Sequence, residues 1–355
     1  MLRRTFLFTV GTAALSRPLG AATGSPMRIG QIGTVHPHAA GKMAAMRSLP
    51  ADWNVVGLVE SDRHQLSVTK KPPYEGLPLM SEEALLGTRD VKAIGVETRI
   101  EDAAATALRV LRAGKHVHLD KPGALNHADF KAMRMEAERR SLVLQMGYML
   151  RYNPAFELLF RAVRAGWLGE IMEVDAVMGK LAGVGLRAEI KALPGGGMFE
   201  LGGHVIDVIL TLLGKPHKVT GSSTPTRNDG VDDNQFALLE YPRATASVRI
   251  NFSDPFGGPR RRFNVTGTGG TFEIMPLESG RVKLSLTTAR ENYQKGIQDL
   301  QLPLPGNKYA GEFQDLARVI RGEKLFAWDA THDIAVHETL SRAANVWKET
   351  DQRLP

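Results

Sequence analysis

The sequence MRIGQIG at residues 27–33 reads as a short apolar strand that ends in a glycine turn, and a helical stretch to Met46 follows it. Further apolar runs lie downstream, and segments with helical spacing separate them. Strands that alternate with helices predict a parallel sheet with helices on both faces. The predicted strands are 27–32, 53–59, 91–96, 116–119 and 142–146, and the clearest helices are 102–112 and 128–139.

After Arg151 the pattern changes. Residues 218–286 contain mostly strand-like runs separated by Gly, Asn and Pro turns, which favours a second, largely antiparallel sheet. We therefore expect an α/β protein with a first domain at 27–150, a second at 151–328 and a C-terminal helix within 329–355. The other predicted helices are 154–165, 199–213, 309–321 and 330–347.

Composition narrows the classes of function. The chain has 355 residues, a net charge of +7 and no cysteine, so disulfides, thiolate metal sites and a cysteine nucleophile are excluded. Three of the positive charges, Arg3, Arg4 and Arg17, lie in the first 26 residues, and without them the charge is +4. The only basic run is Arg260–Arg262, and we predict no nucleic-acid partner.

Residues 1–26 have the composition of an export signal. Arg3 and Arg4 precede an apolar run at 6–15, and the small residues Gly20-Ala21-Ala22 follow. The run is too short to span a bilayer, so we predict a cleaved twin-arginine-type signal. The mature protein is then periplasmic or secreted, with no membrane span. The alternative is a cytoplasmic N-terminus with two adjacent arginines by chance.

The turn after the first strand is where a dinucleotide fold binds phosphate. It contains Gly33-Thr34-Val35-His36-Pro37-His38 and keeps only the first glycine of the Gly-x-Gly-x-x-Gly pattern. Helix amides still bind phosphate without the other two. Glu60 ends the second strand and would accept ribose hydroxyls while repelling a 2′-phosphate, which favours NAD over NADP. The predicted cofactor-binding residues are Gly33, Thr34, Val35, His36, Glu60, Thr98, Asp120 and Lys121.

Two segments carry residues for chemistry. Asp120-Lys121-Pro122 follows the fourth strand, at the sheet edge where ligands bind. Glu200, His204 and Asp207 lie at i, i+4 and i+7 of an apolar helix, so we expect them on one buried face. His204 would exchange a proton with substrate, and Glu200 or Asp207 would orient it. The alternatives are a metal site and a core histidine satisfied by Asp207; we predict no metal.

Three motifs together resemble the Gfo/Idh/MocA family, named for glucose–fructose oxidoreductase and inositol dehydrogenase. They are AGKHVHLDKP at 113–122, GYMLRYNPA at 147–155, and the glycine-rich segment from Gly195 that ends in Gly202-x-His204-x-x-Asp207. The resemblance runs over residues 27–345. It implies a Rossmann domain followed by an α/β domain whose large open sheet often forms a dimer or tetramer interface.

The resemblance also implies roles for residues. Lys121 would polarise the substrate oxygen, His204 would act as general acid/base, and Glu200 stands where the family has Asp. Substrate-binding candidates are Arg151, Tyr152 and Asp207, with Lys180 and Arg187 in the loops that would set specificity. The chain departs from the family at 98–103, where Thr-Pro-x-x-x-His is replaced by Thr-Arg-Ile-Glu-Asp-Ala.

Three functions remain open on this basis. The first is an NAD(P)-dependent oxidoreductase that acts on a CH–OH group of a sugar, cyclitol or derivative and holds its cofactor tightly, because free NAD is scarce outside the cytoplasm. The second is an NAD-dependent glycosidase that works by oxidation and elimination. The third is a sugar-binding relative without catalysis.

Overall fold

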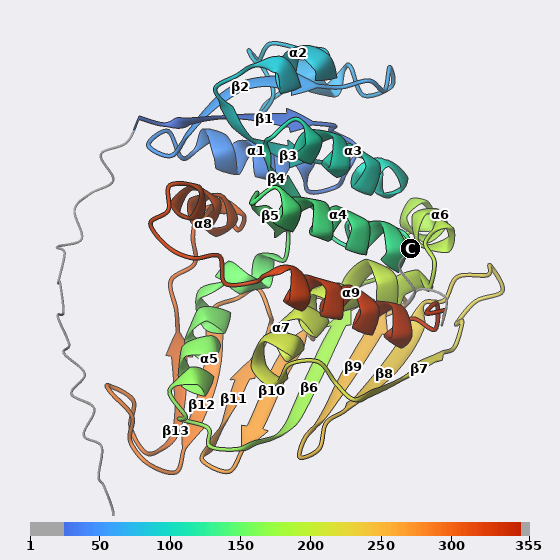
Figure 1. Cartoon of the computed structure of the whole chain (residues 1–355). Helices are drawn as coiled ribbons and strands as arrows, with labels where there is room; N and C mark the ends of the chain where they lie inside the picture. The colour runs from blue at the N-terminus through green and yellow to red at the C-terminus, as the bar shows by residue number, and fades with distance from the viewer. Residues whose placement is uncertain (1–24, 349–355) are drawn as a thin grey trace, which may run out of the picture.

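The computed structural model describes residues 25–348 and has two sheets, one above the other, joined by helices (Figure 1). The first sheet has five strands in the order β2-β1-β3-β4-β5, and every pairing is parallel. This confirms the predicted Rossmann-type sheet. Its strands are β1 Met27–Ile32, β2 Trp53–Val59, β3 Val91–Val96, β4 His116–Leu119 and β5 Leu144–Met146.

Helices between these strands begin and end at recognisable signals. In α3, acidic residues occupy the first turn and Arg109 and Arg112 the last, as the helix dipole favours. The N-cap of α4 is Asn126, whose side chain accepts a hydrogen bond from the backbone N–H of Asp129. The elements are α1 Ala39–Arg47, the 3₁₀ turn η1 Val68–Lys70, α2 Glu82–Gly87, α3 Ile100–Arg112 and α4 His127–Arg139.

The second sheet has eight strands in the order β13-β12-β11-β10-β6-β9-β8-β7. All neighbours pair antiparallel except β6 and β9, which confirms the predicted large, mostly antiparallel sheet. The strands are β6 Ile171–Gly179, β7 Lys218–Ser223, β8 Asn234–Glu240, β9 Thr245–Asn251, β10 Arg262–Gly267, β11 Gly270–Ile274, β12 Arg281–Leu286 and β13 Gly296–Gln301.

One face of this sheet is covered by helices, as Figure 1 shows. Side chains in β8 and β10 alternate between buried and half-buried, as in a sheet with one packed face. Helices α5 Pro154–Arg164 and α7 Gly203–Leu213 lie over this face, and α6 Val184–Ala192 stands beside the end of α4 (Figure 1). The 3₁₀ turn η2 Met149–Tyr152 precedes α5, and the π-helix η3 Met198–Gly202 precedes α7.

The last two helices tie the sheets together. Helix α8 (Ala310–Ile320) returns to the first sheet beside α1 (Figure 1), and the Trp53 indole N–H donates to the Phe313 carbonyl at 2.9 Å. The prediction had placed this helix with the second domain. Helix α9 (Ala330–Ala343) packs between α4 and α7.

Some predictions concern residues outside the described range 25–348. Residues 1–24 of the predicted export signal and residues 349–355 of the predicted C-terminal segment lie outside the described residues. Within residues 25–348, no helix has the length and apolar character that a membrane crossing needs.

Candidate active site

Gly33 shapes the turn at the carboxyl end of β1. Its φ is +89°, and its N–H donates to the Val59 carbonyl at 2.8 Å. A Cβ at this position would lie 2.7 Å from the Glu97 carbonyl oxygen and 2.9 Å from the Thr98 nitrogen. Glycine is therefore required for the ends of β1 and β3 to approach this closely.

A cavity of about 440 Å³ opens at the carboxyl ends of β1, β2 and β3. Five of the predicted and neighbouring residues line it: Gly33, Val35, Glu60, Thr98 and Arg99. Glu60 accepts hydrogen bonds from the Thr34 hydroxyl at 2.6 Å and the Asp62 N–H at 2.8 Å, and its remaining lone pairs face no other hydrogen-bond donor within residues 25–348. The cavity, the glycine turn and this carboxylate fit the adenosine and ribose end of a dinucleotide.

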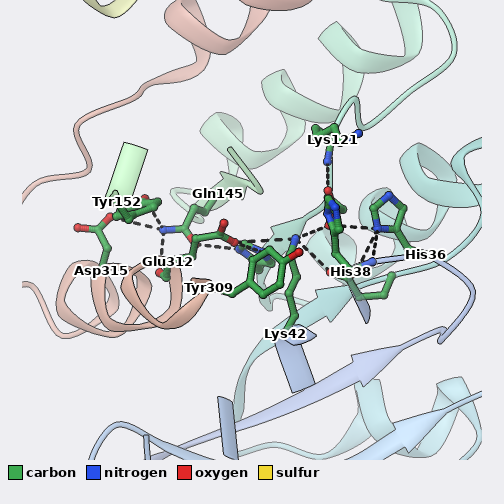
Figure 2. Close-up of polar contacts among 12 residues, drawn as sticks. His36, His38, Lys42, Lys121, Gln145, Tyr152, Tyr309, Glu312 and Asp315 are labelled. Atoms are coloured by element: carbon green, nitrogen blue, oxygen red, sulfur yellow. Dashed lines mark hydrogen bonds and ion pairs between the residues drawn. The ribbon is translucent and has the colours of Figure 1, made fainter. Parts of the chain in front are cut away.

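Further along the same edge is a buried group of charged and polar side chains, which we call the edge cluster: His36, His38, Lys42, Glu97, Asp120 and Glu312 (Figure 2). The Lys42 ammonium lies 2.6 Å from Asp120 Oδ2 and 3.3 Å from Glu97 Oε1. His36 Nδ1 and His38 Nδ1 lie 3.2 and 3.0 Å from the same Asp120 oxygen. His36 and Asp120 thus lie together, as neighbours in one charged group.

Burial and charge act against each other in the edge cluster. Burial alone would lower the pKa of Lys42, but Asp120, Glu97 and Glu312 outweigh it, so the pKa is raised and the ammonium form is kept. Burial raises the pKa of Glu97. For Asp120, burial is outweighed by His36 and Lys42, which hold its pKa well below the usual range.

The polar contacts continue from the edge cluster beneath α8. His118 Nε2 lies 3.0 Å from Glu312 Oε2, and His118 Nδ1 lies 2.9 Å from the Gln145 side-chain oxygen. The Gln145 amide donates to the Tyr152 hydroxyl at 2.8 Å, and this hydroxyl donates to Asp315 at 3.0 Å. Figure 2 shows Tyr152 at the opposite end of these contacts from Lys121, which argues against the predicted substrate contact of Tyr152.

Lys121 and Glu200 meet across the two domains. The Lys121 side chain is 2% exposed; its ammonium donates to the Glu200 carbonyl at 2.7 Å and lies 3.2 Å from Glu200 Oε2. Its backbone N–H donates to Asp120 Oδ1 at 2.7 Å. Burial opposes ionisation of Glu200, but Lys121 and Lys180 outweigh it and lower the pKa of Glu200. The structure therefore brings two of the three predicted catalytic residues into direct contact.

His204 lies in the first turn of α7 and is 2% exposed. Its Nδ1 forms no hydrogen bond with any described residue. Burial, followed by Lys121 and His38, holds the pKa of His204 well below its usual value, so the imidazole is neutral and able to accept a proton. Charges of Lys121 and Asp120 act on it, so His204 belongs to the same site.

The predicted face of Glu200, His204 and Asp207 does not form as expected. Residues Met198–Gly202 form a π-helix, not the start of an α-helix, and the wider turn shifts the phase of Glu200 relative to the residues that follow. Within the described chain, no hydrogen bond joins His204 to Glu200 or Asp207. The prediction that either acid orients the imidazole is therefore not supported.

Asp207 belongs to a second buried group, which we call the helix cluster: Arg134, Arg151, Asp207, His332 and Asp333. Arg151 binds Asp207 through Nε at 3.0 Å and Nη2 at 2.6 Å, and Asp333 at 2.7 Å. The side chains of Arg151 and Asp207 are 0% exposed. This corrects their predicted role in substrate binding, because neither has surface left for a ligand; both stabilise the packing of η2, α7 and α9.

Of the two candidates in the specificity loops, Arg187 and Lys180, only one is bound up in structural ion pairs. Arg187 is buried and bound to Asp229 and Asp233, so it fastens α6 to the start of β8. Lys180 is half-buried and forms no ion pair with residues 25–348; its ammonium lies 5.3 Å from the Phe252 ring centroid. Burial lowers the pKa of Lys180, and the positive charges of Lys121 and Arg261 lower it further, while the negative charge of Glu200 raises it; the net pKa is lowered. The charges of Glu200 and Lys121 therefore act on Lys180.

Sequence reasoning missed Lys42, Glu97 and Glu312. Glu97 directly follows a predicted strand, and an acid at that edge was a usable signal. Lys42 has the appearance of a surface lysine in a helix, and Glu312 lies more than 200 residues away in sequence. Nothing in the sequence alone indicated that these two meet.

Comparison with known proteins now defines the class. Residues 27–148 match the family described as "Oxidoreductase family, NAD-binding Rossmann fold", so the protein is of the class with an NAD-binding Rossmann domain. Residues 156–273 match the "GFO/IDH/MocA C-terminal domain". Together the two matches cover more than half of the chain, and the protein belongs to the GFO/IDH/MocA family of oxidoreductases.

Individual relatives are about 30% identical in sequence and match only part of the chain. A trans-1,2-dihydrobenzene-1,2-diol dehydrogenase of Bos taurus is 31% identical over 203 residues, which are 55% of this chain and 58% of that protein. The uncharacterized oxidoreductase YhhX of Escherichia coli K12 is 30% identical over 224 residues, 62% of this chain and 63% of that protein. The matches thus span about three fifths of these relatives.

Among solved structures, a levoglucosan dehydrogenase in complex with NADH and levoglucosan has a TM-score of 0.79 and 16% identity. The likeness covers 90% of this chain and 97% of that one. It establishes the two-domain fold.

Proposed function

We propose that the protein is an NAD-dependent dehydrogenase that oxidises a CH–OH group of a sugar, a cyclitol or a derivative of either. The observation that carries this proposal is the pairing of a buried lysine, Lys121, with a neutral buried histidine, His204, at the edge where the Rossmann sheet binds its cofactor. The diol dehydrogenase and levoglucosan dehydrogenase among the similar proteins support this class of substrate.

The residues present have the donors and acceptors that NAD requires. Gly33 would shape the turn, the backbone amides of Thr34 and Val35 would bind phosphate, Glu60 would bind the ribose hydroxyls, and Thr98 would line the pocket. NAD supplies the hydride acceptor when bound. An acid at the end of β2 disfavours the 2′-phosphate of NADP, and tight retention of the cofactor is part of the proposal.

The protein residues would manage the proton and the charge. The substrate hydroxyl would lose its proton to His204 as its carbon loses hydride. The Lys121 ammonium would stabilise negative charge on the oxygen. Glu200 fixes Lys121 through two contacts, so it acts as a positioning residue. Lys180 is placed to bind a further polar group of the substrate.

The test combines cofactor analysis with a substrate screen. Purified protein is denatured and its supernatant assayed for nicotinamide nucleotide; native protein is then mixed with NAD⁺ and aldoses, uronates, cyclitols or trans-diols while NADH is followed by absorbance. We expect bound or bindable NAD and NADH formation with at least one class. The exposed His217 provides a matched variant, His217→Ala, that should keep full activity.

Two outcomes contradict the proposal. Release of an aglycone from aryl glycosides with no net NADH would show the oxidation–elimination glycosidase instead. No nucleotide in the protein, no binding on titration with NAD⁺ and sugar binding without turnover would show the non-catalytic relative.

Export is part of the same proposal. Arg3 and Arg4 lead the segment that favours twin-arginine transport, and this route suits a protein that binds its cofactor before it crosses the membrane. An Arg3→Lys, Arg4→Lys double variant should leave the protein in the cytoplasmic fraction. Unchanged export to the periplasm would refute the route.

Assembly into a dimer or tetramer is proposed through the eight-stranded sheet, since the helices among residues 25–348 cover one of its faces and leave the other open (Figure 1). Light scattering on purified protein tests this. A mass equal to a single chain at micromolar concentration would contradict it.

A further inference from the structure

Two imidazoles of the edge cluster face one carboxylate oxygen. His36 Nδ1 and His38 Nδ1 lie 3.2 and 3.0 Å from Asp120 Oδ2, and all three atoms lie within 4.8 Å of one another. Two atoms that bind the same zinc ion at about 2.1 Å are about 3.0–3.4 Å apart. The separations to Asp120 are thus those of ligands around one ion.

The ring nitrogen of His36 lies where a metal ion could replace weaker contacts. His36 Nδ1 lies 3.3 Å from the His38 backbone nitrogen and 3.2 Å from Asp120 Oδ2, so an ion bound to this nitrogen would take over from a long backbone hydrogen bond and from the contact with Asp120. The bond is long and gives way easily to a stronger partner. Asp120 is held in place by the Lys121 N–H on its other oxygen, Oδ1. Outer partners of this kind orient metal ligands.

The charges of the edge cluster do not balance. Asp120, Glu97 and Glu312 are three buried carboxylates, and Lys42 is the one lysine among them. Counted as ionised, the three carboxylates and Lys42 leave two negative charges, which the neighbouring imidazoles or a bound cation would have to offset. Glu97 is 1% exposed, and neither of its carboxylate oxygens accepts a hydrogen bond from the described residues; one faces His36 Nδ1 at 3.5 Å.

The helix cluster provides a contrast within the same chain. Asp207, His332 and Asp333 also place three ligand atoms within the same limit. Their two carboxylates, however, pair with two guanidinium groups, those of Arg151 and Arg134. The charge there is balanced, so a cation would have to displace an arginine, whereas in the edge cluster it would displace only the Lys42 ammonium from Asp120 Oδ2. Geometry alone therefore does not make a site, and charge distinguishes the two groups.

We propose that His36, His38 and Asp120 bind one divalent transition-metal ion, of the kind represented by Zn²⁺ or Co²⁺. Two imidazoles and one carboxylate suit such ions and leave coordination positions open. The two charges of the ion offset the deficit of the cluster. The ion would displace Lys42 from Asp120 Oδ2, which lies 2.6 Å from its ammonium, and leave Lys42 between Glu97 and Glu312. This departs from the expectation from sequence that no metal is bound.

Such an ion would adjoin the proposed active site. Asp120 would bind it through one oxygen, and the other oxygen already accepts the backbone N–H of Lys121. An ion with open positions at this edge would add a Lewis acid for an oxygen ligand. The metal site does not depend on dehydrogenase activity, and the two are tested by separate measurements.

The experiment is equilibrium dialysis of the chelator-treated full-length protein against Zn²⁺, with metal measured by elemental analysis, and a visible spectrum of the Co²⁺ form. We expect one equivalent of Zn²⁺ per chain, a rise in Tm on binding and Co²⁺ absorption bands in the visible. The variants His36→Gln and His38→Gln should each weaken binding by more than about tenfold.

Controls keep the result decisive. His332→Gln alters the helix cluster and should leave zinc affinity unchanged. Circular dichroism and Tm of each variant without metal establish that it is folded; if His38→Gln unfolds, the milder His38→Asn and the wild-type Co²⁺ spectrum decide. Wild-type protein that binds no Zn²⁺ or Co²⁺ overturns the proposal and shows that protons neutralise the cluster. Equal loss in His332→Gln also overturns it.

Discussion

The edge cluster and the helix cluster are both buried and both rich in carboxylates, yet they differ in how charge is compensated. In the helix cluster the forked guanidinium of Arg151 meets two carboxylates at 2.6–3.0 Å, Arg134 lies 3.4 Å from one of them, and no side-chain surface is exposed at Arg151 or Asp207. In the edge cluster three carboxylates share one ammonium, that of Lys42, and otherwise face imidazoles. A balanced group of this kind stabilises a fold, whereas an unbalanced group at a sheet edge is suited to binding something else.

The largest effect is expected beside the edge cluster. Lys121→Ala and His204→Ala should each lower turnover by about 10²–10⁴-fold, because one removes the cation at the reacting oxygen and the other the proton acceptor. Turnover is measured with the best substrate of the screen, and Tm establishes that the variants are folded. Turnover within a few-fold of the wild type in both would refute their assignment.

In the helix cluster, substitution should lower the free energy of unfolding. Arg151→Met leaves Asp207 and Asp333 buried without their main partner and should lower the free energy of unfolding by about 3–5 kcal/mol. Urea denaturation followed by circular dichroism measures this. The loss should be the same with and without Zn²⁺. A change below about 1 kcal/mol would mean that the two carboxylates have another source of compensation.

The variant Lys42→Met tests whether charge compensation is what distinguishes the edge cluster from the helix cluster. Without metal it should lower the free energy of unfolding by about 1–3 kcal/mol, because three carboxylates lose their ammonium but can take up protons instead. Zn²⁺ should recover more of this loss than it does in Arg151→Met, and its affinity should rise. If zinc leaves the Lys42→Met protein as unstable as before, the difference between the clusters does not lie in their charge.

The smallest effect concerns a buried histidine outside both clusters. Burial lowers the pKa of His337 to about 3, and no carboxylate offsets this. The unfolded chain binds a proton at this histidine below about pH 6.5, whereas the folded chain does not bind it until about pH 3. The free energy of unfolding should therefore decrease as pH falls from about 6.5 towards 3, and above pH 6.5 this histidine should have no effect on it. His337→Gln should flatten this slope in urea titrations between pH 4 and 7; an unchanged slope would assign it to other groups.

The sequence predicted what depends on local periodicity. All five strands of the first sheet were placed within two residues, because each is a short apolar run bounded by a turn. Lys121 was placed at the correct edge because the carboxyl ends of parallel strands meet there. Its contact with Glu200 joins residues 79 apart and was not predicted; the resemblance to the family implied only that both belong to the catalytic site.

The parts of the site and the fold that the sequence did not predict depend on tertiary contacts. The spacing of Glu200 and His204 assumed an α-helix, and the π-helix at Met198–Gly202 altered it. Arg151 and Asp207 have polar side chains suited to substrate binding, and only the fold shows that they pair with each other. Strands β6 and β13 and helix α6 were not predicted; β13, for example, alternates exposed and half-buried residues and has no apolar face to detect.

The position of α8 has a consequence for how the protein is made. The indole of Trp53 is bonded to the carbonyl of Phe313, 260 residues later, and Phe313, Leu316 and Ala317 complete the core around α1, β1 and β2. A ribosome that has released only the first 150 residues has therefore produced a sheet whose core around α1, β1 and β2 is incomplete. Until residues 310–320 emerge, the nascent nucleotide-binding half needs a chaperone or rapid synthesis to avoid aggregation.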